Sequence, residues 1–545
     1  MTPSFMTYLS NKCKQYAHRI FYILMNNTSI LHFTTFIGSL SSLDQFITKT
    51  LNDKLPFIVL ISNNILFKSI VFTYCFMTGN KLVMISPKFP ISEVLNTILS
   101  RRGVNLLLVD REILLKIKDA EKEEGINILQ FFTHIETTLK MLEILLEVKD
   151  TTSDNDGKVL RHLTHKSRAR KILTTPLVSI LSPGTTSVPS ITNVPYDTFG
   201  KSTLDLSYFM GLKPGDKVSV IANFELFPTI YTILGLLNGT SYIQLEKDDE
   251  IASHTELKEL LNRSNHKPNV FFISTNNFRN IWDSILSDVY SKKCIYYISK
   301  FHLLLPIVNY FIRRELRNTF GKQTIKIHIL NEELGFSIWN VLKRSKIMFS
   351  ASYGFLEQGN FLAFKDPSMF RNKDFMLKPG GSILKDTKVG IHNLIFEGMN
   401  QEMKIGDIYI PENETTTQIR SGDIGFFVPN TTEQGDRKYL YIYDKNFRND
   451  AKILRSLDLL ERTMKDTFLI RDCFIRKVGD NYEVFIEPRE DLIDTVGMSW
   501  EEYHTAIKKY LEKFKDNTNL HITRFAILKF KGMRNIAGKL QYYAM

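Results

Sequence analysis

The sequence predicts an α/β protein. Its large N-terminal domain is expected to hold two related α/β subdomains and a small β-rich subdomain, and a small mobile α+β domain follows. Continuous apolar runs alternate with amphipathic segments over most of the chain up to Leu330, a pattern typical of βαβ units and buried parallel sheets. Glycine-rich turns between short alternating strands begin near residue 376, and the last hundred residues mix helices and strands. These changes divide the chain into domains 1–444 and 445–545.

The first subdomain is predicted from a series of short apolar runs. The run Phe-Ile-Val-Leu-Ile at 57–61 has no polar alternation, which predicts a strand buried on both faces. Helices are predicted where apolar residues recur at intervals of three and four. The remaining elements predicted here are a hairpin around Asn26-Asn27, helices over 42–51, through Tyr74, over 91–102 and over 112–150, and strands over 81–85, 104–109 and 177–181.

The strand–helix–strand unit occurs a second time further along the chain. Residues 217–222 predict a strand, 229–237 a helix and 241–245 another strand. Asn238-Gly239 stands in the turn where the first copy has Gly79-Asn80, and glycine suits the left-handed residue that ends many helices. The two copies predict a pseudo-symmetric pair of sheets. Further buried strands are predicted over 270–273 and 326–330.

Composition and charge narrow the functional classes. The formal charge of +12 is spread along the 545 residues without a long Lys/Arg block, so we expect a solvated basic surface and no nucleic-acid partner. Such a surface favours anionic small molecules such as nucleotides, and it leaves peripheral contact with anionic membranes open. No apolar run is long enough to cross a bilayer without polar interruption, so no transmembrane segment is predicted.

Cysteine spacing and the N-terminus bear on the compartment. The four cysteines lie far apart and form no CxxC pair, which argues against a zinc site or a disulfide framework and favours a reducing compartment. Residues 1–43 contain Lys12, Lys14 and Arg19 and no acidic residue, as transit peptides do. Because the amphipathic pattern continues beyond them, we interpret these residues as part of the fold and expect a cytoplasmic protein.

A hydroxyl-rich loop follows the predicted strand 177–181. Its sequence is Ser-Pro-Gly-Thr-Thr-Ser, with Ser182, Gly184, Thr185 and Thr186 as candidate ligand contacts. Glycine lets the backbone approach a ligand closely, and hydroxyls and backbone N–H groups can surround phosphate oxygens. Taken alone, the same loop also fits an ordinary surface turn.

This loop resembles the phosphate-binding signature of the adenylate-forming superfamily, which includes acyl-CoA synthetases, luciferases and the adenylation domains of peptide synthetases. The signature reads (S/T)SGTTGxPKG, and this chain has SPGTTSVPSIT. Gly184, Thr185, Thr186 and Pro189 match. Ser190 stands where the family has its lysine.

Further segments resemble the family's later motifs in the same order. Glu332, in Leu-Asn-Glu-Glu-Leu, resembles the GGExL turn beside the adenine, without its glycines. Tyr353, Gly354 and Glu357 resemble YGxTE, in which the tyrosine stacks on adenine and the glutamate binds Mg²⁺; a carboxylate oxygen is what this cation prefers. Leu356 replaces the threonine of that motif and cannot donate a hydrogen bond.

The resemblance continues to the end of the chain. Asp423, in Ser-Gly-Asp-Ile-Gly, resembles TGDxG, whose aspartate holds the ribose hydroxyls. Either Lys445 or Arg448 stands for the arginine of the interdomain hinge. Lys539, in Ala-Gly-Lys-Leu close to the C-terminus, resembles the terminal lysine that stabilises charge as the mixed anhydride forms.

The resemblance implies an enzyme of the acid–thiol ligase class. It would bind ATP and Mg²⁺, join a small-molecule carboxylic acid of a fatty or other acyl type to AMP, and release pyrophosphate. The acyl group would then pass to a thiol, with CoA as the candidate acceptor. Thr185, Glu357 and Lys539 would be the catalytic residues, with Glu357 as the metal ligand.

A second hypothesis is a catalytically impaired member that acts as a binding or scaffold module. It is motivated by Ser190, by Leu356, by the missing glycines near Glu332 and by the short segment after Lys452. An intermediate case would keep adenylation and lose transfer to CoA. The two hypotheses differ in whether the motif residues surround one cavity and catalyse exchange.

Overall fold

The structure is a computed structural model of the 545-residue chain. The residues that it describes are 11–12, 15–16, 19–24, 30–51, 56–99, 105–125, 129–146, 158–159, 162–163, 177–181, 191–222, 233–245, 251–263, 265–292, 295, 305–330, 334, 336–354, 363–365, 379–383, 390–397, 404–411, 418–429, 438–443, 457, 460, 464, 469–479, 481–518 and 521–528.

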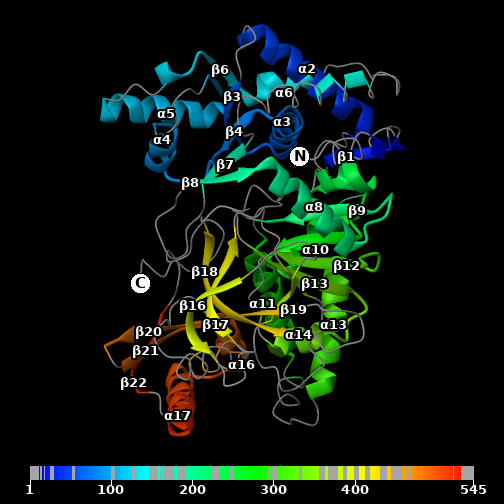
Figure 1. The fold of residues 1–545 in the computed structure, drawn as a ribbon. Helices are drawn as coiled ribbons and strands as arrows, with labels where there is room; N and C mark the ends of the chain where they lie inside the picture. The colour runs from blue at the N-terminus through cyan, green and yellow to red at the C-terminus, as the bar shows by residue number, and fades with distance from the viewer. Residues whose placement is uncertain are drawn as a thin grey trace.

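The first sheet has six strands in the order β6-β5-β3-β4-β7-β8. Every neighbouring pair is parallel except β7 and β8, which are antiparallel. Figure 1 shows this sheet in the N-terminal part of the molecule. Its strands are β3 (Phe57–Ile61), β4 (Lys81–Met84), β5 (Leu106–Val109), β6 (His134–Thr137), β7 (Leu177–Leu181) and β8 (Ile191–Pro195).

Helices cover both faces of this sheet, which explains why its strands are apolar throughout. Alternate residues of β3, such as Val59 and Ile61, pack into one cluster with α4 and α5, whereas Ile58 and Leu60 pack into another with α2, α3 and α8. Parallel strands buried on two faces need no polar alternation. The helices are α2 (Phe33–Leu51), α3 (Ile65–Thr78), α4 (Ile91–Leu99), α5 (Arg111–Glu124), α6 (Thr138–Leu146) and α8 (Tyr196–Met210), and a single 3₁₀ turn covers Leu129–Phe131.

Two predictions in this half of the chain are wrong in their bounds. Residues 112–150 are not one helical region, because β6 interrupts it at the edge of the sheet. Its sequence His-Ile-Glu-Thr has a single apolar residue, and all four positions are half-buried or exposed, so it shows no buried-strand pattern. The helix predicted over 42–51 begins already at Phe33, since that first turn is buried on several sides and lacks a polar face.

The second sheet joins thirteen strands in one hydrogen-bonded ladder. Its parallel part has the order β13-β12-β11-β9-β10-β1, and β2 pairs antiparallel to β1 at the edge. The predicted N-terminal hairpin is confirmed, but it belongs to the second sheet and not to the first. These strands are β1 (Ile20–Leu24), β2 (Ile30–His32), β9 (Lys217–Ile221), β10 (Ser241–Gln244), β11 (Val270–Ser274), β12 (Lys326–Leu330) and β13 (Met348–Tyr353).

The repeated strand–helix–strand unit is confirmed. β9 and β10 pair in parallel as β3 and β4 do, and residues 233–238 between them are helical. Gly79 ends the first copy's helix with φ +73°, and Gly239 stands in the second with φ +67°. A Cβ at Gly239 would lie 2.7 Å from Cδ1 of Tyr16, so close packing as well as backbone conformation requires glycine there.

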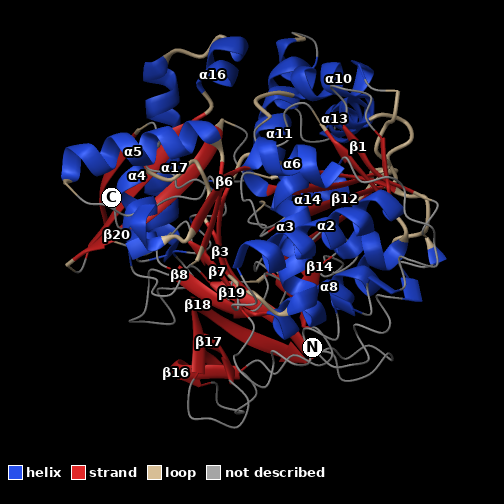
Figure 2. Ribbon diagram, turned by 90° about the horizontal axis from the view of Figure 1, so that it is seen from above, coloured by secondary structure: helices blue, strands red, loops and turns tan. Residues whose placement is uncertain are grey.

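The β-rich segment predicted from residue 376 is confirmed as antiparallel strands, and it continues the second sheet in the order β16-β17-β18-β19-β15-β14-β13. Figures 1 and 2 show β16–β18 on the side of the molecule away from α10 and α13. These strands are β14 (Ala363–Lys365), β15 (Pro379–Ile383), β16 (Gly390–Glu397), β17 (Lys404–Pro411), β18 (Gln418–Pro429) and β19 (Lys438–Tyr443).

A further helical layer covers the second face of the parallel strands. Ile221, Ile273 and Ile329 pack toward it, whereas Val220 and Phe272 face the helices shared with the first sheet. The N-terminal half is thus a stack of helices, sheet, helices, sheet and helices. The helices of this layer are α10 (His254–Arg263), α11 (Thr275–Ser291), α13 (Leu305–Phe320) and α14 (Phe336–Leu342).

The C-terminal part contains a separate three-stranded sheet in the order β20-β21-β22. Many of the buried residues of this part, including Ile470 and Val484 of the sheet and Tyr503 of the helix that follows, belong to the same apolar cluster as α10, α11 and α13. The predicted mixture of helices and strands is confirmed, and this unit packs against α11. Its elements are β20 (Ile470–Val478), β21 (Asn481–Pro488), β22 (Ile522–Ile527), α16 (Glu490–Val496) and α17 (Trp500–Thr518).

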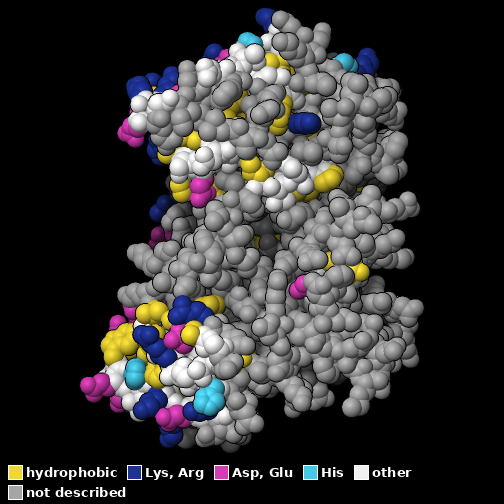
Figure 3. Space-filling model, turned by 60° about the vertical axis from the view of Figure 1, so that its left-hand side comes forward, with side chains coloured by type: hydrophobic (Ala, Val, Ile, Leu, Met, Phe, Trp, Pro, Cys, Tyr) yellow, Lys and Arg dark blue, Asp and Glu magenta, His cyan; other side chains and the backbone are white. Residues whose placement is uncertain are grey.

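Among the described residues, no helix is long and apolar enough to cross a membrane. Figure 3 shows one face of the molecule, on which the described Lys and Arg side chains are interspersed with Asp and Glu over the C-terminal unit. The basic excess of the sequence therefore forms no separate stripe on the described part of this face.

Candidate functional site

The hydroxyl-rich segment joins two strand ends that lie opposite one another. β7 ends at Leu181 and β8 begins at Ile191, and these two residues are partners in the antiparallel register. Ser179 Oγ donates a 2.7 Å hydrogen bond to Asn193 Oδ1, which links the same pair of strands. Figure 1 shows β7 and β8 on the side of the first sheet that faces β18. The strand before the predicted phosphate loop is thus confirmed residue for residue.

Two more predicted segments follow neighbouring parallel strands. Glu332 comes shortly after the end of β12, and Tyr353 is the last residue of β13. The register pairs Ile329 with Ala351, so the chain leaves both strands at the same edge of the sheet. Ligand sites of open α/β sheets lie outside the carboxyl ends of their strands. The end of β12, which precedes Glu332 in the sequence, and the end of β13 at Tyr353 therefore lie at one candidate edge of the sheet.

Polar side chains fix the backbone at this edge. Thr275 Oγ1 donates a 3.0 Å hydrogen bond to the carbonyl of Leu330, which ties the start of α11 to the end of β12. Ser274 caps α11 by accepting a bond from the N–H of Asn277. Ser352, beside the half-buried Tyr353, is 1% exposed and its hydroxyl has no hydrogen-bond partner among the described residues. An unpaired buried hydroxyl at a strand end can pair with a polar ligand.

The backbone of Asp423 lies within β18 and next to the end of β19. Ile424 is the register partner of Tyr443, the last residue of β19, and Lys445 and Arg448 follow shortly after. β18 also pairs with β17, where Asp407 is 6% exposed and opposite Ile424. The backbone of Asp423 thus lies one residue beyond the last described pair of β18 and β19.

Of the predicted site residues, the structure describes Tyr353 and Gly354 fully and Asp423 by its backbone. The remaining positions stay predictions, because they lie outside the described residues. These positions are Ser182, Gly184, Thr185, Thr186, Glu332, Glu357, Lys445, Arg448 and Lys539.

A buried histidine in β12 was not singled out by the sequence. His328 is fully buried, its Nδ1 lies 2.8 Å from Ser350 Oγ, and its Nε2 has no hydrogen-bond partner among the described residues. The rings of Phe272 and Phe364 lie 5.6 and 6.0 Å from its own. Burial lowers the pKa of His328 to about 3, so the imidazole is neutral near pH 7.

This pKa predicts a loss of stability in mild acid. In the unfolded chain the histidine regains a pKa of about 6.5, so between about 3 and 6.5 the unfolded state binds more protons. The stability that His328 contributes above pH 6.5 is lost as the pH falls, by about 2 kcal/mol at pH 5. Denaturant unfolding at pH 7.5 and pH 5 measures this loss.

The variant His328→Asn isolates the contribution, because an amide can keep the bond to Ser350 and does not titrate. We expect its stability difference between the two pH values to be smaller than that of the parent by about 2 kcal/mol. The exposed His134 provides a control, since His134→Gln should leave the difference unchanged. Equal pH dependence in the parent and His328→Asn would contradict the prediction.

The fold is that of solved adenylate-forming ligases. The anthranilate CoA ligase AuaEII, in complex with anthranoyl-AMP, superposes with a TM-score of 0.67 at 12% identity, over 99% of this chain and 96% of that one. The amide bond synthetase McbA from Marinactinospora thermotolerans gives 0.65 at 11% identity over 99% of both chains. The o-succinylbenzoate CoA synthetase MenE from Bacillus subtilis, in complex with ATP and magnesium ion, gives 0.62 at 14% identity over 98% of both.

The sequence itself matches no protein-family model and no curated protein sequence. The likeness therefore consists of the fold, over nearly the whole chain, and it confirms the fold that the sequence motifs predicted. It includes both the large N-terminal part and the C-terminal unit, because the coverage leaves neither out.

Proposed function

We propose that this protein activates a carboxylic acid with ATP, forming an acyl-adenylate and releasing pyrophosphate. The observation that carries the proposal is that the sequence motifs and the fold agree: both independently resemble the same class of ligases. The motifs that resemble the adenylate-forming family follow one another along the sequence, and three of them come at or directly after the ends of β7, β12 and β13, in a fold that is shared with such ligases over 99% of the chain. A chance match of short motifs would not coincide with these strand ends.

The chemistry is an in-line displacement at phosphorus. A carboxylate oxygen of the acid attacks the α-phosphorus of ATP, the bond from that phosphorus to the bridging oxygen of pyrophosphate breaks, and a mixed anhydride remains. The protein contributes orientation and stabilisation of charge. Tyr353 offers its half-buried ring at the carboxyl end of β13, and the unpaired hydroxyl of Ser352 beside it is compatible with a polar ligand.

Roles for the other residues follow from the resemblance and are part of this proposal. Thr185 and Thr186 hold phosphate oxygens, Asp423 accepts hydrogen bonds from the ribose hydroxyls, and Lys539 lies beside the reacting oxygens. Glu357 would hold Mg²⁺, which neutralises the charge of the departing pyrophosphate. Related structures support the nucleotide and the metal, since MenE has been solved with ATP and magnesium ion.

The proposal also covers the class of acid that is activated and the acceptor of the acyl group. Solved relatives include ligases of anthranilate and benzoate and a fatty acyl CoA synthetase, so an aromatic or a fatty acid fits the fold. CoA is the acceptor that we propose, because most of these relatives are named as CoA ligases; the amide bond synthetase shows that the same fold also serves another product. Localisation in the cytoplasm is proposed on the cysteine usage.

ATP–pyrophosphate exchange with a panel of aromatic and fatty acids tests the first step. We expect exchange that requires Mg²⁺ and one class of acid. Adding CoA and looking for the thioester by mass spectrometry then tests the acceptor. Exchange without thioester would favour an adenylating enzyme that uses another acceptor.

The impaired binding module remains the second candidate, motivated by Leu356 and Ser190. It predicts ATP binding in calorimetry without exchange for any acid. That outcome would overturn adenylation and retain nucleotide binding. Absence of both binding and exchange would overturn the two candidates together.

A further inference from the structure

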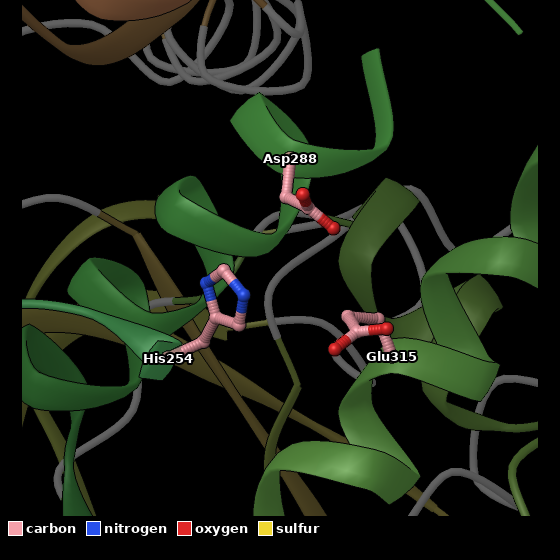
Figure 4. A group of neighbouring side chains, drawn as sticks. All are labelled: His254, Asp288 and Glu315. Carbon is pink, nitrogen blue, oxygen red and sulfur yellow. The ribbon is translucent and has the colours of Figure 1, made fainter. Parts of the chain in front are cut away.

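Three ionisable side chains from three helices converge on the outer layer of the second sheet. His254 is the first residue of α10, Asp288 lies in the last turn of α11, and Glu315 lies in the middle of α13. A ligand atom of each lies within 4.8 Å of the others. Figure 4 shows the three side chains pointing toward one another. The group has no part in the proposed adenylation chemistry.

The imidazole of His254 is held in a fixed orientation. The side chain is 6% exposed, and its Nδ1 lies 2.8 Å from Ser284 Oγ. The other ring nitrogen, Nε2, is on the side of the two carboxylates and has no hydrogen-bond partner among the described residues. Ligating histidines bind a metal through one nitrogen while an oxygen partner of the other nitrogen fixes the ring. Ser284 provides such a partner.

The spacing of the three atoms fits a small cation after a slight contraction. For any three atoms that lie within 4.8 Å of one another, there is a point no more than about 2.8 Å from each. Bonds from Zn²⁺ to histidine nitrogen and carboxylate oxygen measure about 2.0–2.2 Å. Rotation of the Asp288 and Glu315 side chains about their χ angles can close a difference of about 0.7 Å.

The charges also suit a divalent ion. The cluster contains two carboxylates, and each is near one ammonium group: Lys258 Nζ lies 3.7 Å from Glu315, and Lys292 Nζ lies 3.8 Å from Asp288. Both lysine side chains are about half exposed, and such pairs stabilise a protein little. A cation that bonds directly to the oxygens can therefore displace them.

We propose that His254, Asp288 and Glu315 form a binding site for a divalent transition ion of the Zn²⁺ class. One imidazole nitrogen with two carboxylate oxygens is a borderline donor set, whereas Mg²⁺ and Ca²⁺ prefer oxygen alone. This proposal departs from the expectation, drawn from the cysteine spacing, that a zinc site is absent. That expectation considered cysteine ligands, and none of these three ligands is a cysteine. Three protein ligands leave further positions for water.

A metal ion here would join α10, α11 and α13 to one another. These helices pack together over β11 and β12, and each contributes one ligand from a different part of the sequence. An ion that binds only the folded chain stabilises it by mass action. The site would therefore act as a clip on the outer layer.

Titration of the metal-free full-length protein with ZnCl₂ in a calorimeter tests the proposal. We expect one equivalent of Zn²⁺ per chain at this site, and a rise in the thermal midpoint on addition of the ion. Substitution with Co²⁺ should give visible absorption bands that report its coordination. Neither measurement needs ATP or an acid, so the outcome is independent of the proposed function.

Matched variants assign the binding to this site. His254→Gln and Asp288→Asn should each weaken Zn²⁺ binding at least tenfold, and Ser284→Ala about tenfold through loss of the ring's partner. Lys258→Gln should instead strengthen it by up to about fivefold, since the competing ammonium near Glu315 is removed. His134→Gln, at an exposed strand residue, should have no effect.

The Asp288→Asn variant guards against loss of folding, because the Asp288 side chain is 42% exposed. Zn²⁺ binding that is unchanged in both His254→Gln and Asp288→Asn would overturn the proposal. So would the absence of Zn²⁺ binding to the parent at millimolar concentration, or binding of Mg²⁺ in preference to Zn²⁺.

Discussion

Lys539→Ala is expected to lower the rate of ATP–pyrophosphate exchange by about 10²–10³-fold, the usual effect of removing one charge-stabilising group from an active site. Negative charge builds up on the oxygens between the acid and the α-phosphate as the mixed anhydride forms, and an ammonium group placed there stabilises it. ATP binding should change little, because the groups proposed for the phosphates, the ribose and the adenine remain. Exchange kinetics and calorimetry on the same preparation measure the two effects separately.

The control for this variant is Lys508→Ala. Lys508 is an exposed lysine of α17 in the same C-terminal unit, so its removal changes the charge of that unit equally. We expect exchange at the parent rate. Equal exchange in Lys539→Ala and Lys508→Ala would contradict the role of Lys539, and a matching fall in ATP affinity would indicate a binding role in place of a catalytic one.

The sequence predicts the buried strands because their signal is local. The strands predicted over 57–61, 177–181 and 326–330 have these bounds in the structure. Each is a run of mostly apolar residues between polar or glycine-containing segments, and burial on both faces allows that composition. The edge strand β6 has no such run, and it was therefore included in a predicted helix.

Pairings over long distances in the sequence have no local signal. β1 lies at the N-terminus and pairs with β10 (Ser241–Gln244), so that the first hairpin extends the second sheet. Nothing in the residues of β1 specifies that distant partner. The same applies to His254, Asp288 and Glu315, whose spacing follows no metal-binding motif and whose approach depends on how α10, α11 and α13 pack.

At the candidate adenylation site, some features could be predicted from local sequence and others could not. The order of the motifs indicated which strand ends to compare, and the described register aligns the end of β12 with β13, whose last residue is Tyr353. The unpaired Ser352 hydroxyl and the neutral His328 could not be predicted, since both are consequences of burial by distant side chains. A histidine within an apolar strand was the only signal of the latter.

The contact between the C-terminal unit and α11 contains a buried ion network. Asp283 of α11 lies 2.9 Å from Arg489 Nε and 3.6 Å from Arg471 Nε, and its side chain is 13% exposed. Arg279, one helical turn earlier, lies 3.5 Å from Asp472. Burial raises the pKa of Asp283 even though the three arginines lower it, so desolvation outweighs their attraction.

Asp283→Ala is expected to reduce the free energy of unfolding of this contact by about 3–5 kcal/mol, because Arg489, only 7% exposed, would keep its charge without its anion. Hydrogen exchange of α16 and β20 under native conditions measures the loss, since a chain of this size need not unfold in one step. Glu483→Gln provides the control. Its partner Arg476 is 42% exposed, and we expect a change below about 1 kcal/mol.

The same desolvation predicts that removing both charges costs less than removing one. In Asp283→Leu combined with Arg489→Met, neither a buried anion nor a buried cation remains at the centre of the network, and apolar side chains of similar length can fill the space. We therefore expect the double variant to recover most of the stability that Asp283→Ala loses. A double variant that is as unstable as the sum of its single variants would show that the two residues act independently, and the network would then contribute nothing specific to the position of the C-terminal unit.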